Sequence, residues 1–385
     1  MRIVVVGAGI VGAAAAYELV RAGAEAILVD AAHEGRATAA GAGIICPWSG
    51  ATAHPLAAAG AGHYPELLAA LAEDGAHEVG YRKVGALLLL PPDEASAEQL
   101  KARVTARAAA DPHAGRVTTV DAAEARRLFP ALGNGSGGFQ GTALHLAGAA
   151  RLDGRRMRAA LVAAAERRGL RTVGGTASIE ARGGRVRGVR VAGELIGADA
   201  VVAAAGAWSP GLLGPAGVRL DVVPQRGQIV HLRLPGSDTA HWPVVLPGTG
   251  HYLLTFDDSR VVVGATREQG SGFDHRVTAA GLAEVLDHAL AVAPGLASAT
   301  HLETRVGFRP VSPHGRPLLG TVPALEGLVV ANGLGAEGLT AGPYAGAVAA
   351  RLALGREPGL DLTPYDPSLA PGPEGPEMPS APPGP

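Results

Sequence analysis

Residues 1–30 read MRIVVVGAGIVGAAAAYELVRAGAEAILVD, and this stretch decides the fold. Its apolar and small-residue pattern predicts a strand over residues 2–6, a helix that reaches Ala22, and a second strand that ends at Asp30. Gly23 stands where a helix commonly stops. The stretch therefore predicts a β-α-β unit at the start of a nucleotide-binding domain.

Between the first strand and the helix lies the loop Gly7-Ala8-Gly9-Ile10-Val11-Gly12. Glycines at this spacing allow a tight turn and a close backbone approach to a pyrophosphate, and the free N–H groups of the following helix favour anions. Asp30 follows about 20 residues later, where a carboxylate can accept hydrogen bonds from a ribose. The pattern favours a dinucleotide site, with an ordinary tight strand-helix turn or a signal peptide over the first twenty residues as alternatives.

The composition excludes several classes of partner. The 33 basic and 35 acidic residues give a net charge of −2 without a long block of like charge, which argues against nucleic-acid binding. Cys46 is the only cysteine, so an intrachain disulfide and a thiolate metal cluster are excluded, and a cytoplasmic location fits. The histidines show no metal-ligand spacing, and no further run of about 18 apolar residues predicts a membrane span. Residues 367–385 are rich in proline and glycine and are expected to be disordered.

The pattern of strand, small-residue loop and helix recurs twice. One copy is the strand 198–205 with Gly206-Ala207-Trp208 behind it, and the other is the strand 327–331, the glycine-rich loop 332–338 and the helix 339–354. Strand-like stretches also occur at 86–90, 222–232, 252–256 and 260–264. A nucleotide domain that is interrupted and resumed in this way indicates a cofactor larger than a nicotinamide dinucleotide, laid across several strand ends.

Five segments together resemble the D-amino-acid oxidase and glycine oxidase family, which includes sarcosine oxidase and D-amino-acid dehydrogenase. The resemblance runs from Met1 to about Gly355. The five segments are VVVGAGIVG from Val4, RATAAGAGII from Arg36, VVAAAGAWS from Val201, VVPQRGQI from Val222, and GFRPVSPHGRPLLG through NGLGAEGLTAGPYAG from Gly307.

The resemblance implies an α/β fold in which a Rossmann-like, glutathione-reductase-type FAD domain is interleaved with a mixed-sheet α+β substrate domain. We assign residues 1–78, 145–218 and 306–366 to the first domain and residues 79–144 and 219–305 to the second. The family's cofactor is FAD. Sarcosine oxidases attach it through a cysteine after the arginine motif, whereas this chain has Val311-Ser312-Pro313-His314, so we expect noncovalent FAD.

The resemblance also implies which residues contact the cofactor. Where the family usually has a Thr-Ser pair, this chain has Thr38-Ala39, so the serine hydroxyl and its expected contact with the cofactor are missing. A helix N-terminus near Gly338 would stabilise negative charge that builds up on the flavin during hydride transfer. The expected cofactor-binding residues are Gly7, Gly9, Ile10, Val11, Gly12, Asp30, Arg36, Thr38, Ala39, Gly43, Ile44, Thr176, Gly206, Gly335, Ala336, Glu337, Gly338, Leu339 and Thr340.

Two residues are expected to form the substrate site. Arg309 matches the family arginine that binds the substrate carboxylate, a role suited to a planar fork that stays charged. Tyr252 matches the tyrosine that donates its hydroxyl to the same carboxylate. Glycine oxidases carry a second arginine in the last loop, where this chain has Ala336, and the alternative for each residue is ordinary packing or surface exposure. Cys46, Trp48 and His251 are further candidates for the pocket wall.

These expectations combine into one functional hypothesis. The chain is predicted to be an FAD-dependent amino-acid or amine oxidoreductase that transfers a hydride from Cα of glycine, a D-amino acid or an N-substituted amino acid to flavin N5, giving an imine that hydrolyses. The alternatives are an FAD-dependent 2-hydroxy-acid or glycerol-phosphate dehydrogenase and a non-catalytic flavin-binding assembly protein. The sequence leaves open whether O2 or another electron acceptor reoxidises the flavin, and whether the chain forms a homo-oligomer.

Overall fold

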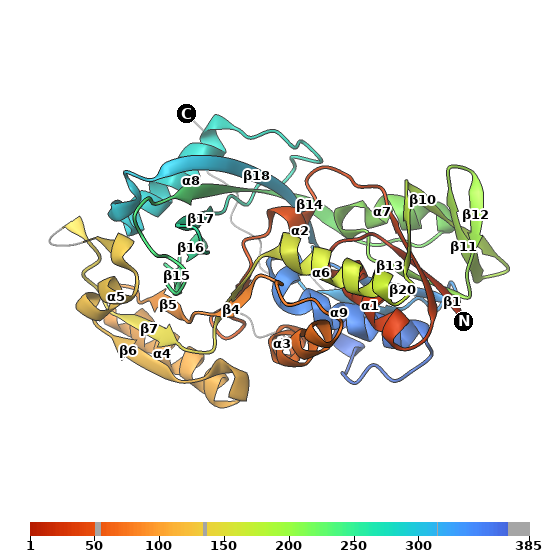
Figure 1. The fold of residues 1–385 in the computed structure, drawn as a ribbon, viewed down its shortest axis with the longest axis horizontal. Coiled ribbons are helices and arrows are strands. Elements are labelled where there is room, and N and C mark those ends of the chain that lie inside the picture. Colours follow the sequence, from red (N-terminus) through yellow and green to blue (C-terminus); the bar gives the residue numbers. More distant parts are fainter. Residues whose placement is uncertain (51–54, 134–136, 314, 369–385) are drawn as a thin grey trace.

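Two lobes lie side by side in the computed structural model, which describes residues 1–50, 55–133, 137–313 and 315–368. One lobe contains the N-terminal strand and its helix, and the long strands β14 (Val223–Arg233) and β18 (Thr300–Val311) run from it into the other lobe (Figure 1). These two strands pair with each other along their length. They therefore tie the lobes together.

The first lobe is built on a mainly parallel sheet of order β19-β20-β13-β1-β2-β9. β1 pairs in parallel with β2 and β13, and only the edge strand β19 runs antiparallel to its neighbour within the described residues. The strands are β1 (Arg2–Val6), β2 (Glu25–Asp30), β9 (Arg171–Gly174), β13 (Ala200–Ala203), β19 (Leu318–Thr321) and β20 (Leu328–Asn332).

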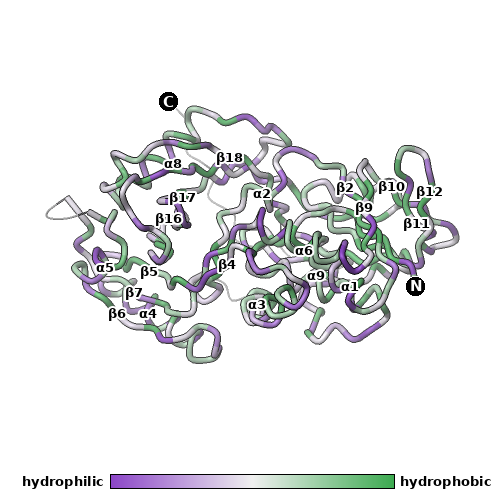
Figure 2. Tube along the Cα trace, in the orientation of Figure 1, coloured by the Kyte–Doolittle hydropathy of each residue, from purple (hydrophilic) through white to green (hydrophobic). Residues whose placement is uncertain are grey.

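Both faces of this sheet are covered, which explains the uninterrupted apolar run in β1. Ile3 and Val5 face a core shared with the helices, whereas Val4 and Val6 face a second core on the opposite side. Figure 2 shows hydrophobic residues gathered around β2, β9 and β10. The helices are α1 (Ile10–Arg21), α3 (Pro55–Glu73), α6 (Gly154–Arg167) and α9 (Gly338–Ala353), and the opposite face carries β10 (Ala177–Arg182), β11 (Arg185–Val191), β12 (Glu194–Gly197) and α7 (Ser209–Leu213).

The second lobe contains a mixed sheet of order β18-β14-β17-β16-β15-β5-β7-β6. β15 and β5 pair in parallel and the other neighbours are antiparallel. α8 (Ala279–Val292) packs on β14 and β17. The remaining strands of this sheet are β5 (Ala86–Leu89), β6 (Val117–Val120), β7 (Ala143–Leu146), β15 (Val244–Leu246), β16 (Tyr252–Thr255) and β17 (Arg260–Gly264). In the chain, α4 (Glu94–Ala109) lies between β5 and β6, and α5 (Ala122–Leu128) lies between β6 and β7.

Short elements complete the fold. A small sheet of order β3-β8-β4 and the one-turn helix α2 belong to the segments that link the lobes. Their bounds are β3 (Ile44–Ile45), β4 (Tyr81–Lys83), β8 (Ala150–Leu152) and α2 (Ala37–Ala40). The 3-10 turns are η1 (Pro112–Ala114), η2 (Pro130–Leu132), η4 (Gly206–Trp208), η5 (Gly214–Ala216), η6 (Pro294–Leu296), η7 (Gly335–Glu337) and η8 (Thr363–Tyr365).

The predicted strands and helices are confirmed, with ends shifted by one or two residues. The domain limits predicted at 144/145 and 305/306 fall inside β7 and β18, so each cut divides a continuous strand. The tail predicted from residue 367 lies outside the described residues from position 369 onward. Across the described residues, no helix has the length and apolar character needed to cross a bilayer.

Candidate functional site

A cavity of about 960 Å³ lies where the two lobes meet. Its walls include the three glycine-rich loops after β1, β13 and β20, together with the segment 36–44. The second lobe contributes residues from β14, β16 and β18 and from the loops beside them. Three loops that are far apart in the sequence therefore converge on one space.

The first loop is a turn that only glycine can form here. Gly7 has a φ of +100°, and a Cβ on it would overlap the Ala204 carbonyl. A Cβ on Gly12 would overlap the Gly7 carbonyl oxygen, and Gly12 does not line the cavity. Gly12 thus allows α1 to pack against the turn, while Gly7, Gly9, Ile10 and Val11 line the cavity.

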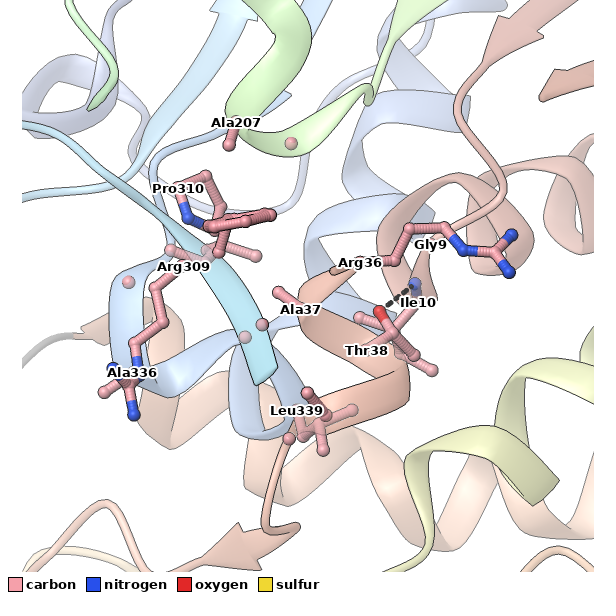
Figure 3. A pocket seen from close by; sticks show the side chains of 18 of the residues that line it. Gly9, Ile10, Arg36, Ala37, Thr38, Ala207, Arg309, Pro310, Ala336 and Leu339 are labelled. Atoms are coloured by element: carbon pink, nitrogen blue, oxygen red, sulfur yellow. Dashed lines mark hydrogen bonds between the residues drawn. The ribbon is translucent and has the colours of Figure 1, made fainter. Parts of the chain in front are cut away.

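Asp30 ends β2 at the rim of the cavity. Its carboxylate forms an ion pair with Arg36 at 2.9 Å and accepts a longer hydrogen bond of 3.4 Å from the Ala8 N–H. Figure 3 shows Arg36 and Arg309 extending in opposite directions from the pocket. The pocket therefore has two ends, with the Asp30–Arg36 pair at one and Arg309 at the other.

The segment around α2 closes the wall between the first loop and the second lobe. The Thr38 hydroxyl oxygen accepts a hydrogen bond of 2.9 Å from the Ile10 N–H, at the start of α1 (Figure 3). Gly43 has a φ of +91° and, like Ile44, lines the cavity. Ala39 does not line it, and its carbonyl accepts a hydrogen bond from Arg155.

The third loop brings the start of α9 to the cavity. Residues 334–340 all line the cavity, and Gly335 has a φ of +52°. Tyr64 donates a hydrogen bond to the Leu339 carbonyl, and the Thr340 hydroxyl donates to the Ile44 carbonyl at 3.0 Å. These two bonds fix the first turn of α9 against α3 and the small sheet.

The N-termini of α1 and α9 lack the side-chain cap that the structure describes at four other helices. Aspartate or threonine side chains cap α4, α5, α6 and α8, whereas the N-cap residues Gly9 of α1 and Glu337 of α9 form no such bond. Both uncapped termini line the cavity. The Ile10 N–H of α1 is taken by the Thr38 hydroxyl, and the other first-turn N–H groups of the two helices are donors for an anionic ligand. This donor set fits the phosphates and electron-accepting ring of FAD.

The end of the cavity near Asp30 is lined by aromatic and small residues. His33 stacks on Trp208 with ring centroids 4.8 Å apart, and both residues line the cavity. Thr176 and Gly206 also lie in the wall. No sequence motif marks His33 as a residue of the site.

Arg309 and Tyr252 lie together at the other end. Arg309 donates hydrogen bonds to the Thr266 carbonyl at 3.1 Å and to the Gln225 side chain at 3.5 Å, and it interacts with the Tyr252 hydroxyl. Burial raises the pKa of Tyr252, while Arg309 opposes that rise. Burial also lowers the pKa of Arg309, but a guanidinium starts so far above neutrality that it stays charged. The guanidinium of Arg309 and the hydroxyl of Tyr252 therefore lie next to each other in a half-buried part of the cavity wall.

Arg267 is the main residue that the sequence analysis missed. It lines the cavity from the loop after β17, and it is close enough to lower the pKa of Arg309. No sequence motif identifies it, since its position depends on how that loop folds over the sheet. The second arginine expected of a glycine oxidase at position 336 is absent, and Ala336 lines the cavity instead.

Of the three further candidates for the pocket wall, Cys46, Trp48 and His251, two line the cavity. His251 and Cys46 line the cavity, and burial raises the pKa of Cys46 to about 11, so its thiol is protonated at neutral pH. Trp48 does not line it and donates a hydrogen bond to Asp111. Among the described residues, no group of three or more His, Cys, Asp or Glu side chains is arranged to hold a metal ion. Position 314, the last of the four residues after Arg309-Pro310 on which noncovalent binding was expected, lies outside the described residues.

The structure brings most of the predicted site residues to the same cavity. Gly12 and Ala39 are the two that do not line it. The predicted residues that line it are Gly7, Gly9, Ile10, Val11, Asp30, Arg36, Thr38, Gly43, Ile44, Thr176, Gly206, Tyr252, Arg309, Gly335, Ala336, Glu337, Gly338, Leu339 and Thr340.

Comparisons with known proteins agree with this architecture. The DAO family model, described as FAD dependent oxidoreductase, matches residues 2–352. The chain is 32% identical to glycine oxidase from Pseudomonas aeruginosa, covering 95% of this chain and 98% of that protein. It is 44% identical to the uncharacterized oxidoreductase YurR from Bacillus subtilis, again covering 95% and 98%. The structure of iminodiacetate oxidase from Chelativorans sp. BNC1 is 47% identical, with a TM-score of 0.91 and coverage of 95% and 99%.

These similarities confirm the family, the fold class, the FAD cofactor and the oxidoreductase class that the sequence predicted. The non-catalytic alternative has no support, since the similar proteins are enzymes. The roles of individual residues and the limits of the two domains stay predictions.

Proposed function

Because the chain belongs to the DAO family of FAD-dependent oxidoreductases, we propose that it oxidises the C–N bond of an amino acid whose carboxylate binds Arg309 and Tyr252. The single observation that carries this proposal is the placement of both side chains in the wall of one cavity, at the end away from Asp30 and Arg36. A guanidinium and a phenol together offer several donors to one carboxylate.

The chain's own residues bind and orient the substrate. Arg309 is held by the Thr266 carbonyl and the Gln225 side chain, so little side-chain freedom is lost when a carboxylate binds. FAD, when bound, supplies the acceptor for the hydride that leaves the carbon next to the amine. Fixing the carboxylate fixes the direction of that C–H bond, and orientation of this kind can supply several kcal/mol of the rate enhancement.

Two further features support the same chemistry. The uncapped first turn of α9 aims N–H groups at the cavity, where they stabilise negative charge without rearranging. Apolar side chains such as Ile229 and Leu246 line part of the cavity. With the amine unprotonated, loss of hydride leaves a protonated imine. Water hydrolyses it to a keto acid and ammonia, or to an aldehyde and an amine if the nitrogen is substituted.

Similar proteins suggest which amino acids to test first. One is a glycine oxidase and another is an iminodiacetate oxidase, so the chain is proposed to act on glycine or on an N-substituted glycine. The competing hypothesis is oxidation of a 2-hydroxy acid, which would also present a carboxylate to Arg309. The two differ in whether nitrogen or oxygen stands on the reacting carbon.

The test is anaerobic reduction of the bound flavin, followed by absorbance. We expect glycine, N-methylglycine, iminodiacetate or a D-amino acid to bleach the flavin, and 2-hydroxy acids and glycerol phosphate to leave it oxidised. Bleaching by 2-hydroxy acids alone would favour the competing hypothesis. A flavin that no member of this panel bleaches would contradict the proposal.

The flavin is proposed to be noncovalent. The segment after Arg309, Val311-Ser312-Pro313-His314, contains no cysteine that could attach it. Acid precipitation of the yellow protein should therefore release the flavin into the supernatant. Flavin that remains in the pellet would show a covalent link.

A further inference from the structure

A second, much smaller cavity lies at the junction of the two lobes. Its volume is about 10 Å³, which is room for about one water molecule. The segment around α2 and the start of α6 line it on the side of the first lobe, and β14, β17 and β18 line it on the side of the second. The ionisable residues in its wall are Asp153, Arg155, His231, Arg260 and Arg305.

The sheet of the second lobe brings three of these side chains to one place. His231 lies on β14, between the neighbouring strands β17 and β18, which carry Arg260 and Arg305. Arg305 pairs with the residue two positions before His231, and Arg260 pairs with the residue two positions after it. Because side chains in a strand alternate between the two faces, all three lie on the same face of the sheet.

His231 carries polar atoms that have no partner among the described residues. Its side chain is 2% exposed, and neither Nδ1 nor Nε2 takes part in a hydrogen bond. Burial lowers the pKa of His231, so the ring is neutral at pH 7 and has one N–H to donate. A buried donor without an acceptor is costly, so this N–H calls for an acceptor in the cavity.

Two of the three arginines in the wall already have a carboxylate. Asp153 pairs with Arg260 at 3.2 Å, and its other oxygen accepts hydrogen bonds from backbone N–H groups of the first turn of α6. Arg305 donates a hydrogen bond of 2.8 Å to Glu303, which does not line the cavity. The charges of these two arginines are therefore compensated by the protein.

Arg155 supplies the positive charge that is left over. Its guanidinium donates a hydrogen bond of 2.8 Å to the uncharged Ala39 carbonyl, and among the described residues it forms no ion pair. The three guanidinium groups in the wall add to the effect of burial on the pKa of His231 and lower it further, against the charge of Glu303. Arg155 is also exposed, so an ion can reach the cavity from the solvent along it.

We propose that this cavity binds a single monatomic anion such as chloride, held by the N–H of His231 and by the guanidinium groups of Arg155 and Arg260. The volume excludes phosphate, sulfate and carboxylates, which are several times larger than one water molecule. A water molecule could accept the hydrogen bond of His231 but would leave the charge of Arg155 uncompensated. An anion does both, and its hydrogen bonds to guanidinium groups are charge-assisted.

The anion would hold the two lobes together. The segment α2 packs on α6 of the first lobe and on β18 of the second, and the small cavity lies among these three elements. Thr38 of α2 accepts the hydrogen bond from Ile10 at the first glycine-rich loop. The anion therefore stabilises the folded arrangement that also forms the wall of the large cavity.

The first experiment measures thermal unfolding of the FAD-loaded protein at neutral pH. Sodium chloride replaces sodium gluconate at constant ionic strength, so that the screening of surface charges stays the same while only chloride fits the cavity. We expect the unfolding temperature to rise with the chloride concentration, because a ligand that binds only the folded protein stabilises it by mass action. Bromide should act as chloride does. An unfolding temperature that is the same in all three salts would overturn the proposal.

Two variants assign the effect to the cavity. Arg155→Gln removes the uncompensated charge and should need roughly tenfold more chloride for the same rise in unfolding temperature, as expected for the loss of one charge-assisted hydrogen bond. Arg156→Gln is the matched control, because Arg156 is the next residue of α6, is exposed and does not line the cavity. It should respond to chloride as the wild type does. An equal response in the two variants would also overturn the proposal.

The second experiment locates the ion. Crystals grown in sodium bromide are measured at the bromine absorption edge, where bromide gives a strong anomalous signal and water gives none. We expect a peak between His231, Arg155 and Arg260 in the wild type and in Arg156→Gln, and no peak there in Arg155→Gln. A wild-type cavity that holds a water molecule without an anomalous peak would contradict the proposal. Neither experiment involves turnover, so both results are independent of whether the protein oxidises amino acids.

Discussion

Arg309 shows how one side chain can be held ready for a carboxylate. The Thr266 carbonyl and the Gln225 side chain each take one of its donors, and both contacts are to uncharged acceptors. Neither partner neutralises the positive charge, so the attraction for an anionic ligand remains. The residue could be identified from the sequence because a motif surrounds it, whereas Arg267 and His33 reach the cavity through loop geometry that no local pattern encodes.

The planar arrangement of N–H donors on the Arg309 guanidinium should matter as much for carboxylate binding as its charge. Arg309→Lys keeps the positive charge and loses the planar pair of donors, so we expect the dissociation constant of a carboxylate ligand to rise roughly tenfold or more. The measurement is a titration of the FAD-loaded variant with pentanoate, followed by flavin absorbance. An unchanged dissociation constant would mean that the guanidinium does not contact the carboxylate.

His231 should make the folded protein sensitive to acid. It is buried in β14, and burial, reinforced by the nearby Arg305, lowers its pKa to about 3 from the ordinary value of 6.5. Between these two values the unfolded chain takes up a proton that the folded chain does not. Stability therefore falls as the pH drops through this window, by at most about 1.4 kcal/mol per pH unit from this group.

The check on His231 is a difference measurement. The free energies of unfolding of the wild type and of His231→Leu are compared by denaturant titration at pH 7 and at pH 5, with FAD in excess. From pH 7 to pH 5, the free energy of unfolding of the variant should rise relative to that of the wild type. A gap that is independent of pH would show that His231 is not held in its neutral form.

At the scale of the element, the contact between α1 and α9 is made close by glycine. Gly342 and Gly346 of α9 face α1, and a Cβ on Gly346 would overlap the Val11 carbonyl oxygen. The two helices both begin at the cavity, so their separation sets the distance between the two uncapped N-termini. The sequence predicted both helices from periodicity and end signals, but it could not show that glycines far apart in the chain meet.

Adding one methyl group at this contact should weaken the packing that holds the N-termini of α1 and α9 in place at the cavity. Gly346→Ala is expected to lower the free energy of unfolding by roughly 1–3 kcal/mol through overpacking, and to weaken FAD binding with it. Gly214→Ala is the control, because Gly214 has helical φ and ψ of −54° and −47°, and a Cβ added to it would meet no atom within 4 Å. The control should unfold at the same temperature as the wild type or at a slightly higher one. Thermal unfolding and FAD titration measure both effects, and a Gly346→Ala variant that matches the control in both would contradict the close contact.

At the scale of the whole molecule, the site depends on chain segments that are far apart in sequence. The first loop, the loop after β13 and the loop after β20 each begin at the end of a parallel strand, and parallel strands present these ends on one edge of their sheet. That rule allowed the convergence to be predicted from the sequence. The paired strands β14 and β18 then carry the second lobe over the edge.

The domain limits stay predictions. The limits at 144/145 and 305/306 lie within β7 and β18, because pairing with distant strands decides where a strand ends. Strand pairing of this kind is non-local and leaves little trace in a single sequence. The wall made by β16 and the loop after β17, which contains Arg267, was for the same reason only partly predicted.

The most direct test of the account compares a carboxylate substrate with its neutral amide in anaerobic flavin reduction, in the wild type and in Arg309→Met. In the wild type, the amino acid that reduces the flavin fastest should do so far more effectively than its amide. In the variant this advantage should disappear, while the flavin remains bound. An advantage of the carboxylate that is as large in Arg309→Met as in the wild type would contradict the central claim.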